Sequence, residues 1–382
     1  MFAPALSIVP CSHSLNGRTS RTPPQREKVF LKCAASSSDN SFLTWLEDRG
    51  LQQVDQKVEI RSSPQYGRFL QASQKVKQNE TILKIPEPLI LTKEAALREL
   101  KIGQQLKDID ASEQCCLAAF LAEHAMAMEE GQAREWAPYL GVLPAAVDGV
   151  LEWSPEERST LLQGSPTGRR AEELVAQVDA ACSLLLDAVP ASALSPQRLR
   201  WAFSVLFSRL VRLEGMGDAL TLIPFADLLN HIPSSTAFID FDPVAQAVVL
   251  RADAAYEAGE QVYASYGEKS SGDLLLSYGF VPTNVTNPYE SVELEIMLRD
   301  DDPLLECKAA ALAEYGLSSS ERFPLRMGAM PASAIPVRLV SCHRYVTPSR
   351  GWLMRLATYE QGDGWCGSPP MSKGMADAAR HL

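Results

Sequence analysis

A long helical pattern interrupts a strand pattern in this chain, and that interruption constrains the fold most. Residues 57–92 contain short Ile-, Val- and Thr-rich runs broken by Gly, Asn and Pro, which is typical of antiparallel strands. From about 94 to 215 apolar residues recur every three or four positions, which predicts helices. Strand-like runs return between 221 and 266. Because neither strand region can cover its own apolar face, we predict one β domain assembled from both, an α+β architecture with a helical insertion.

Helices are expected on both sides of this domain as well. FLTWLEDR at 42–49 has helical spacing and is followed by Gly50, a residue that commonly ends helices. SGDLLLSYG at 271–279 and PLLECKAAALAEY at 303–315 show the same spacing.

Composition excludes several classes of protein. Hydrophobic residues make up 46% of the 382 residues and charged residues 22%, so the chain can bury a sizeable core. No apolar run approaches the ~20 residues of a membrane helix. The net charge of −11, without a basic patch, argues against nucleic-acid binding. The eight cysteines follow no regular spacing, so neither a disulfide framework nor a metal site is predicted.

Two other features have simple structural interpretations. Glu214-Gly215-Met216-Gly217 resembles a nucleotide-binding turn, but it follows a helical pattern and precedes a strand, the reverse of the order such a turn requires. Cys115, Cys116 and His124 lie in one apolar helical segment and are expected to be core residues.

The stretch 221–281 carries the polar residues most suggestive of chemistry. Asn230 and His231 come after an apolar helical turn and just before a proline, which predicts an amide and an imidazole side by side at a loop. Aromatic and turn residues follow, namely Tyr263, Tyr266, Gly267, Tyr278 and Gly279. Core packing explains one such tyrosine well, but it explains less well a set of them beside an Asn-His pair.

In order and spacing these motifs resemble a SET domain. Asn230-His231, GEQVYASYG at 259–267 and LLSYGFV at 275–281 look like the C-terminal core of that domain. More narrowly, the chain is similar to the plant Rubisco large-subunit lysine methyltransferase family. EWAPYLGVLP at 135–144 matches a signature of that family's inserted helices, FSRLVRL at 207–213 its basic helix, and ETILKIPEPLILT its first SET strands. The resemblance covers about residues 42–340.

The resemblance implies S-adenosylmethionine as cofactor, bound between the SET core and the inserted helices. It assigns Asn230 and His231 to the two ends of the cofactor, and Arg209 to its carboxylate. It assigns Tyr266 to catalysis. The remaining assignments are Tyr66, Gly67 and Arg68 to the first cofactor-binding turn, Tyr278 to the cofactor and the methyl-transfer channel, and Phe238, Tyr266 and Tyr278 to the substrate channel.

The chain departs from the family in two places. The first turn usually reads Gly-x-Gly-Leu, whereas Phe69 stands here in place of the second glycine. The C-terminal region is also shorter than usual. We therefore expect a SET domain over 42–285 with its insertion at about 94–215, the start of a helical substrate-binding domain at 286–340, and an irregular tail at 341–382. Because docking surface is missing from the shortened helical domain, we expect weaker substrate recognition.

These observations predict a monomeric protein-lysine N-methyltransferase of the SET class that acts on a protein substrate and binds neither nucleic acid nor membranes. Rubisco large subunit and aldolase are the best-known substrates of the family. Two alternatives remain: a histidine acceptor, since a related animal enzyme methylates actin histidine, and a catalytically weak scaffold subunit of a plastid complex. Retention of Asn230, His231, Arg209 and Tyr266 argues against the scaffold, while Phe69 and the short tail favour it. A Cys-His hydrolase lacks a suitable nucleophile.

The N-terminus predicts import into an organelle, the chloroplast stroma first and the mitochondrion second, with an ordinary disordered tail as the alternative. Residues 1–38 are rich in Ser and Thr, carry five basic residues and one acid, and lack an apolar secretory core, as is typical of a transit peptide. Leu31-Lys32-Cys33-Ala34 resembles a stromal cleavage site. We expect removal of roughly the first 33–40 residues. N-terminal sequencing of the protein recovered from cells measures this, and an intact Met1 in a cytosolic fraction would contradict it.

Overall fold

The computed structural model describes residues 37–52, 56–63, 67–132, 134–282, 285–298, 300–302, 305–314 and 318–326. These residues form two compact units, the first ending at Asn287 and the second beginning at Pro288. No helix within the described ranges is long and apolar enough to cross a membrane.

The strands of the first unit confirm a β domain built from both sides of the insertion. β1 (Val58–Ser63) and β2 (Gly67–Ala72) form an antiparallel pair. A three-stranded antiparallel sheet has the order β3 (Thr81–Pro86), β8 (Ala247–Arg251), β7 (Ile239–Asp242). Since β3 precedes the insertion and β8 follows it, hydrogen bonds between them join the two halves of the domain.

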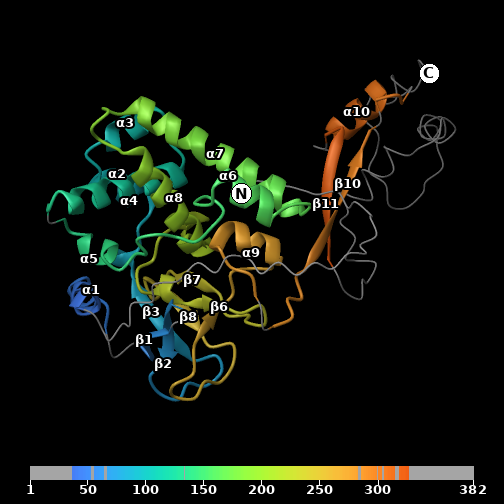
Figure 1. Ribbon diagram of the computed structural model, residues 1–382. Helices are drawn as coiled ribbons and strands as arrows, with labels where there is room; N and C mark the ends of the chain where they lie inside the picture. Colours follow the sequence, from blue (N-terminus) through green and yellow to red (C-terminus); the bar gives the residue numbers. More distant parts are fainter. Residues whose placement is uncertain are drawn as a thin grey trace, which may run out of the picture. The chain divides into compact units, whose positions relative to one another are not determined.

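Helices occupy the insertion between these strands, and Figure 1 shows them gathered on one side of the β domain. They are α2 (Lys93–Glu99), α3 (Gly103–Asp108), α4 (Glu113–Glu129), α5 (Ala137–Leu140), α6 (Pro155–Leu161), α7 (Pro166–Ala188) and α8 (Pro196–Arg209), with the 3-10 helix η2 (Glu87–Leu89) before them. The helix expected through residue 213 ends earlier, at Arg209. Residues Val211–Leu213 instead form β4, which pairs with β5 (Ala219–Thr221) across η3 (Glu214–Met216) and the left-handed Gly217, so the Gly-Met-Gly segment is a hairpin turn.

Helix α4 lies in the centre of the core. Its residues from Cys115 to Ala125 are buried on every side, which confirms that Cys115, Cys116 and His124 are core residues. The expected helix before Gly50 is α1 (Ser37–Asp48), and the left-handed backbone of Gly50 (φ 96°) follows it. Phe42 and Trp45 of α1 stack on Tyr139 of α5, at ring-centroid distances of 6.3 and 6.4 Å, so α1 packs into the same core.

Short elements after the insertion form the remainder of the first unit. They are η4 (Ala226–Leu228), β6 (Asn230–His231), β9 (Tyr263–Ala264) and α9 (Ser271–Tyr278). Ser270 and Asp273 form a capping box at the start of α9, and Gly279, in the left-handed conformation, follows its last residue. The helix expected over 271–279 is thereby confirmed.

The second unit contains the helix expected at 303–315 and, in addition, two strands that the sequence analysis did not predict. Helix α10 (Leu305–Glu314) is present, but β10 (Ser291–Met297) and β11 (Ser320–Arg326) form an antiparallel pair on either side of it in sequence. The alternation of apolar and acidic residues in SVELEIM explains β10, because a period of two favours strands. The tail at 341–382 lies outside the described residues, as does the predicted transit peptide up to residue 36.

His124 generates a testable pH dependence of stability. Burial lowers the pKa of His124 to about 4, whereas an exposed histidine titrates near ~6.5. Between pH ~6.5 and pH ~4 the unfolded chain binds a proton on this histidine and the folded chain does not. The contribution of the neutral ring to the free energy of unfolding is therefore complete above pH ~6.5 and declines as the pH falls. From about pH 6.5 to about pH 5 this loss amounts to about 2 kcal/mol.

The measurement is urea unfolding of wild type and His124→Gln at about pH 7 and about pH 5. The glutamine is neutral at both pH values, and its amide can still donate to the Phe120 carbonyl, which lies 2.9 Å from His124 Nδ1. We expect the free energy of unfolding to fall by about 2 kcal/mol more in wild type than in the variant. Equal losses in the two proteins would contradict the assignment.

Candidate functional site

Asn230 and His231 lie in a short strand, not in the loop expected from the sequence. β6 pairs in parallel with β9, which sets Asn230 beside Tyr263 and His231 beside Ala264. β9 is in turn joined to β2 by the preceding residues, since Val262 N donates to Leu70 O at 2.9 Å and Ala72 N to Glu260 O at 2.8 Å. The Asn-His pair and the Tyr-rich segment are thus held side by side by backbone hydrogen bonds.

The imidazole of His231 is held from one side only. Its Nδ1 lies 3.2 Å from the Ala264 carbonyl and 3.1 Å from the backbone N–H of Tyr266, so it donates to the first or accepts from the second, according to the tautomer. Its Nε2 is buried and has no hydrogen-bond partner among the described residues. Burial lowers the pKa of His231, so the ring is neutral at neutral pH. Either tautomer leaves one polar atom for a ligand.

Stacked rings continue from His231. Tyr266 lies 5.0 Å from the His231 ring with an interplanar angle of 18°, and Tyr278 lies 4.5 Å from Tyr266 at 28°. Phe280 follows, at 6.3 Å from Tyr278. We call the rings of His231, Tyr266 and Tyr278 the aromatic column. It confirms that the tyrosines beside the turn glycines gather with the Asn-His pair.

The two phenols of the aromatic column are neutral. Burial raises the pKa of Tyr266 far above its ordinary value and that of Tyr278 to about 12. The Tyr266 hydroxyl donates a hydrogen bond to the Leu229 carbonyl at 2.6 Å, so its O–H bond is directed at the residue that precedes Asn230. The Tyr266 oxygen therefore keeps its lone pairs for another contact.

Arg209 has a buried carboxylate partner that the sequence analysis did not single out. Its Nη1 donates to Asp227 at 3.0 Å, both to the carbonyl and to Oδ2. The hydroxyl of Tyr139 donates to the same Oδ2 at 2.9 Å. Arg209 Nε is buried and without a partner in the described structure. The signal for Asp227 was a lone acid in the apolar run IPFADLLNH.

A strained turn leads into this carboxylate. Phe225 has φ 76° and ψ −51°, a conformation that bulky residues rarely adopt, and its side chain is buried. Such a residue costs ~1–3 kcal/mol and persists only where the surroundings fix it. Here the hydrogen bonds to Asp227, inside η4, and to Leu229, directly after η4, fix the turn.

Part of the predicted cofactor-binding turn, Gly67 and Arg68, belongs to β2, which contacts η4. Tyr66 lies outside the described residues. Gly67 begins β2 with φ 63°, a value that favours glycine, and the Arg68 guanidinium donates to the carbonyl of Val142 after α5. Since β2 also contacts η4, this segment lies against the turn that carries Asp227.

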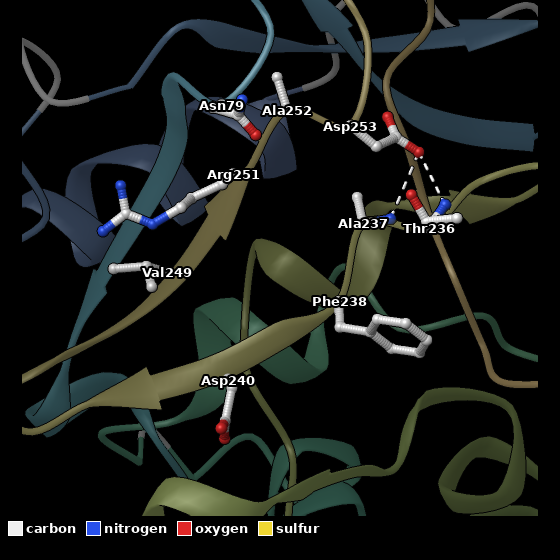
Figure 2. Close-up of a pocket in the computed structure, with 9 residues that line it drawn as sticks. All are labelled: Asn79, Thr236, Ala237, Phe238, Asp240, Val249, Arg251, Ala252 and Asp253. Carbon is white, nitrogen blue, oxygen red and sulfur yellow. Dashed lines mark hydrogen bonds between the residues drawn. The ribbon is translucent and has the colours of Figure 1, made fainter.

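Phe238 does not join the aromatic column. Its ring is 60% exposed and makes no ring contact with Tyr266 or Tyr278. Figure 2 shows it instead at a surface pocket beside Ala237, while Val249 and Arg251 line the same pocket from β8. Phe238 directly precedes β7, and its place in the substrate channel stays a prediction.

Comparison with known families decides what this arrangement is. The family described as SET domain matches residues 67–267, which include β2, the insertion and the segment that ends beside Tyr266. The chain belongs to the SET-domain family. The resemblance and the α+β fold predicted from the sequence are both confirmed.

Named relatives of this SET-domain protein are methyltransferases of plants and animals. The chloroplastic Rubisco large-subunit N-methyltransferase of Pisum sativum is 26% identical over 358 residues, covering 88% of this chain and 70% of the relative. The chloroplastic aldolase-lysine N-methyltransferase of Arabidopsis thaliana is 30% identical, covering 73% and 60%. The actin-histidine N-methyltransferase of Gallus gallus is 26% identical, covering 77% of this chain and half (50%) of the relative.

Solved structures agree on the fold of this SET-domain protein. The SET domain of LSMT bound to lysine and AdoHcy superposes with a TM-score of 0.70 at 22% identity, over 86% of this chain and 80% of that one. Rubisco LSMT bound to AdoMet gives 0.67, also at 22% identity, over 85% and 79%. Across the described residues, no group of three or more His, Cys, Asp or Glu side chains is placed to hold a metal ion.

Proposed function

We propose that this SET-domain chain is an S-adenosylmethionine-dependent protein-lysine N-methyltransferase. The observation that carries the proposal is the aromatic column, with the unpartnered atoms His231 Nε2 and Arg209 Nε on elements that converge on it. Buried polar atoms are nearly always hydrogen-bonded, so these orphans indicate a polar ligand. Relatives named as lysine methyltransferases support the reaction class.

The residues fit the cofactor chemically. S-adenosylmethionine carries a carboxylate, and Arg209 uses only Nη1 on Asp227, so Nε and Nη2 remain as a planar fork for such a group. The side-chain amide of Asn230, which precedes His231 on β6, offers both donors and an acceptor. Together with His231 Nε2 these groups would hold the polar ends of the cofactor.

When bound, the cofactor supplies a methyl group on a sulfonium, which a neutral amine can attack without a metal or a covalent enzyme intermediate. Lysine normally carries a proton at neutral pH, since its pKa is about 10.4. Walls made of the neutral rings of Tyr266 and Tyr278 disfavour the ammonium form and exclude water. The Tyr266 hydroxyl uses its hydrogen in the bond to the Leu229 carbonyl, so its oxygen keeps its lone pairs. These lone pairs can orient and stabilise the reacting centre.

The acceptor residue and the compartment are further parts of the proposal. Lysine is favoured by the plant relatives, and histidine is the second candidate because actin-histidine methyltransferases match over a similar part of the chain. The names of the plant relatives and the basic, acid-poor leader support the plastid, with Rubisco large subunit or aldolase as candidate substrates.

Labelled S-adenosylmethionine, incubated with the mature protein and a stromal extract, tests the function. We expect a labelled protein band, and mass spectrometry of that band to place the methyl group on lysine. Methylation of histidine would support the second candidate. Cofactor binding without any transfer would favour the scaffold alternative.

Variants of the aromatic column and of the Asn-His pair separate catalysis from binding. Tyr266→Phe keeps the ring and removes only the hydroxyl, so we expect turnover to fall by about ten-fold or more while cofactor affinity changes little. Asn230→Ala removes contacts present before and during the reaction and should weaken cofactor binding instead. Steady-state kinetics and titration with S-adenosylhomocysteine measure both. Equal turnover of Tyr266→Phe and wild type would remove this hydroxyl from the mechanism.

A further inference from the structure

We propose that Tyr139 and Asp227 are positioning residues that orient Arg209 toward the amino-acid end of the cofactor. The inference rests on the proposed function, because it takes the ligand of Arg209 to be the carboxylate of S-adenosylmethionine. It adds a role for the helical insertion, since Tyr139 comes from α5 and Arg209 from the end of α8.

Asp227 fixes the plane of the Arg209 guanidinium. One nitrogen, Nη1, donates to two oxygens of the same residue, the backbone carbonyl and Oδ2, each at 3.0 Å. The Asp227 side chain is only 2% exposed, so little water competes for these bonds. Because Nη1 is held in this way, the Nε edge of the guanidinium is directed away from Asp227, and Nε has no partner among the described residues.

Tyr139 fixes Asp227 in turn. Its hydroxyl donates to Oδ2 at 2.9 Å, and burial together with the neighbouring carboxylate raises the pKa of Tyr139 far above its ordinary value, so the phenol always donates. The ring is fully buried and packs against Phe42, Trp45 and Trp136. Helix α1, which precedes the region matched by the SET family, thereby supports the site.

The strained backbone at Phe225 explains why such a clamp is needed. The turn that carries Asp227 would relax toward an ordinary conformation unless its surroundings held it. Two donors on Oδ2, from two different helices, hold the turn in the conformation that presents Arg209.

The experiment compares two variants that delete the same group from similar sites. Tyr139→Phe removes the hydroxyl that donates to Asp227 at 2.9 Å, and Tyr256→Phe removes one that donates to Asp253 at 3.0 Å. Both tyrosines are buried, but Tyr256 and Asp253 are not part of the site. Isothermal titration of the full chain measures the dissociation constants of S-adenosylhomocysteine and of 5′-methylthioadenosine, which lacks the amino-acid end. Melting temperatures report general damage.

We expect Tyr139→Phe to bind S-adenosylhomocysteine about ten-fold more weakly and methylthioadenosine with unchanged affinity, while Tyr256→Phe binds both like wild type. Asp227→Asn, which keeps the shape but loses the charge, should show the same selective loss. The proposal is overturned if Tyr139→Phe weakens both ligands equally, or if it behaves like Tyr256→Phe. Failure of wild type to bind S-adenosylhomocysteine overturns the proposed function itself.

Discussion

The parallel pairing of β6 with β9 is the interaction on which the rest of the site depends. Each strand has only two residues, so neither is stable except through its neighbours. The pairing sets His231 against Ala264, and the imidazole then contacts the backbone N–H of Tyr266. From that contact follow the stacking of Tyr266 on His231 and the bond from its hydroxyl to Leu229. One short ladder thus positions an imidazole, a phenol and a carbonyl.

A buried carboxylate connects the helical insertion to the segment that leads into this ladder. Asp227 accepts from α5 through Tyr139 and from α8 through Arg209, and it lies three residues before Asn230. A charge buried to this degree is costly unless it is paired and hydrogen-bonded, and here it is both. Burial opposes the charge of Arg209, yet the Asp227 carboxylate outweighs burial and raises the pKa of Arg209. The Arg209 guanidinium therefore stays charged.

The chemistry of the site depends on neutral groups. His231 is kept neutral by burial, and burial also keeps the phenols of Tyr266 and Tyr278 protonated. The Asp227 carboxylate lies close enough to act on Tyr266, but it is paired with Arg209 and therefore offers no free negative charge to an incoming ammonium. This is consistent with the proposed methyl transfer to an uncharged amine. The same neutrality is compatible with an imidazole acceptor, so the acceptor depends on shape and hydrogen bonding around the column.

The sequence by itself determined the elements and the residue types. The change from a period of two to one near 3.6 and back located the insertion, and the strands on its two sides had to share a sheet because neither could cover its own apolar face. The motif order also indicated that Asn230, His231, Tyr266 and Tyr278 belong together. It predicted α9 and its Gly279 stop, since capping is encoded within a few residues.

Only the tertiary structure decided which of these residues touch. In the sequence Asp227 is one acid in an apolar run. Its partners are Tyr139 of α5, 88 residues away, and Arg209 of α8, 18 residues away. Phe238 proved to line a surface pocket, apart from the stacked rings of Tyr266 and Tyr278. The helix expected through 213 ended at Arg209, because Val211 could pair with Thr221. Local periodicity encodes elements, but contacts between distant segments depend on packing, which no local pattern records.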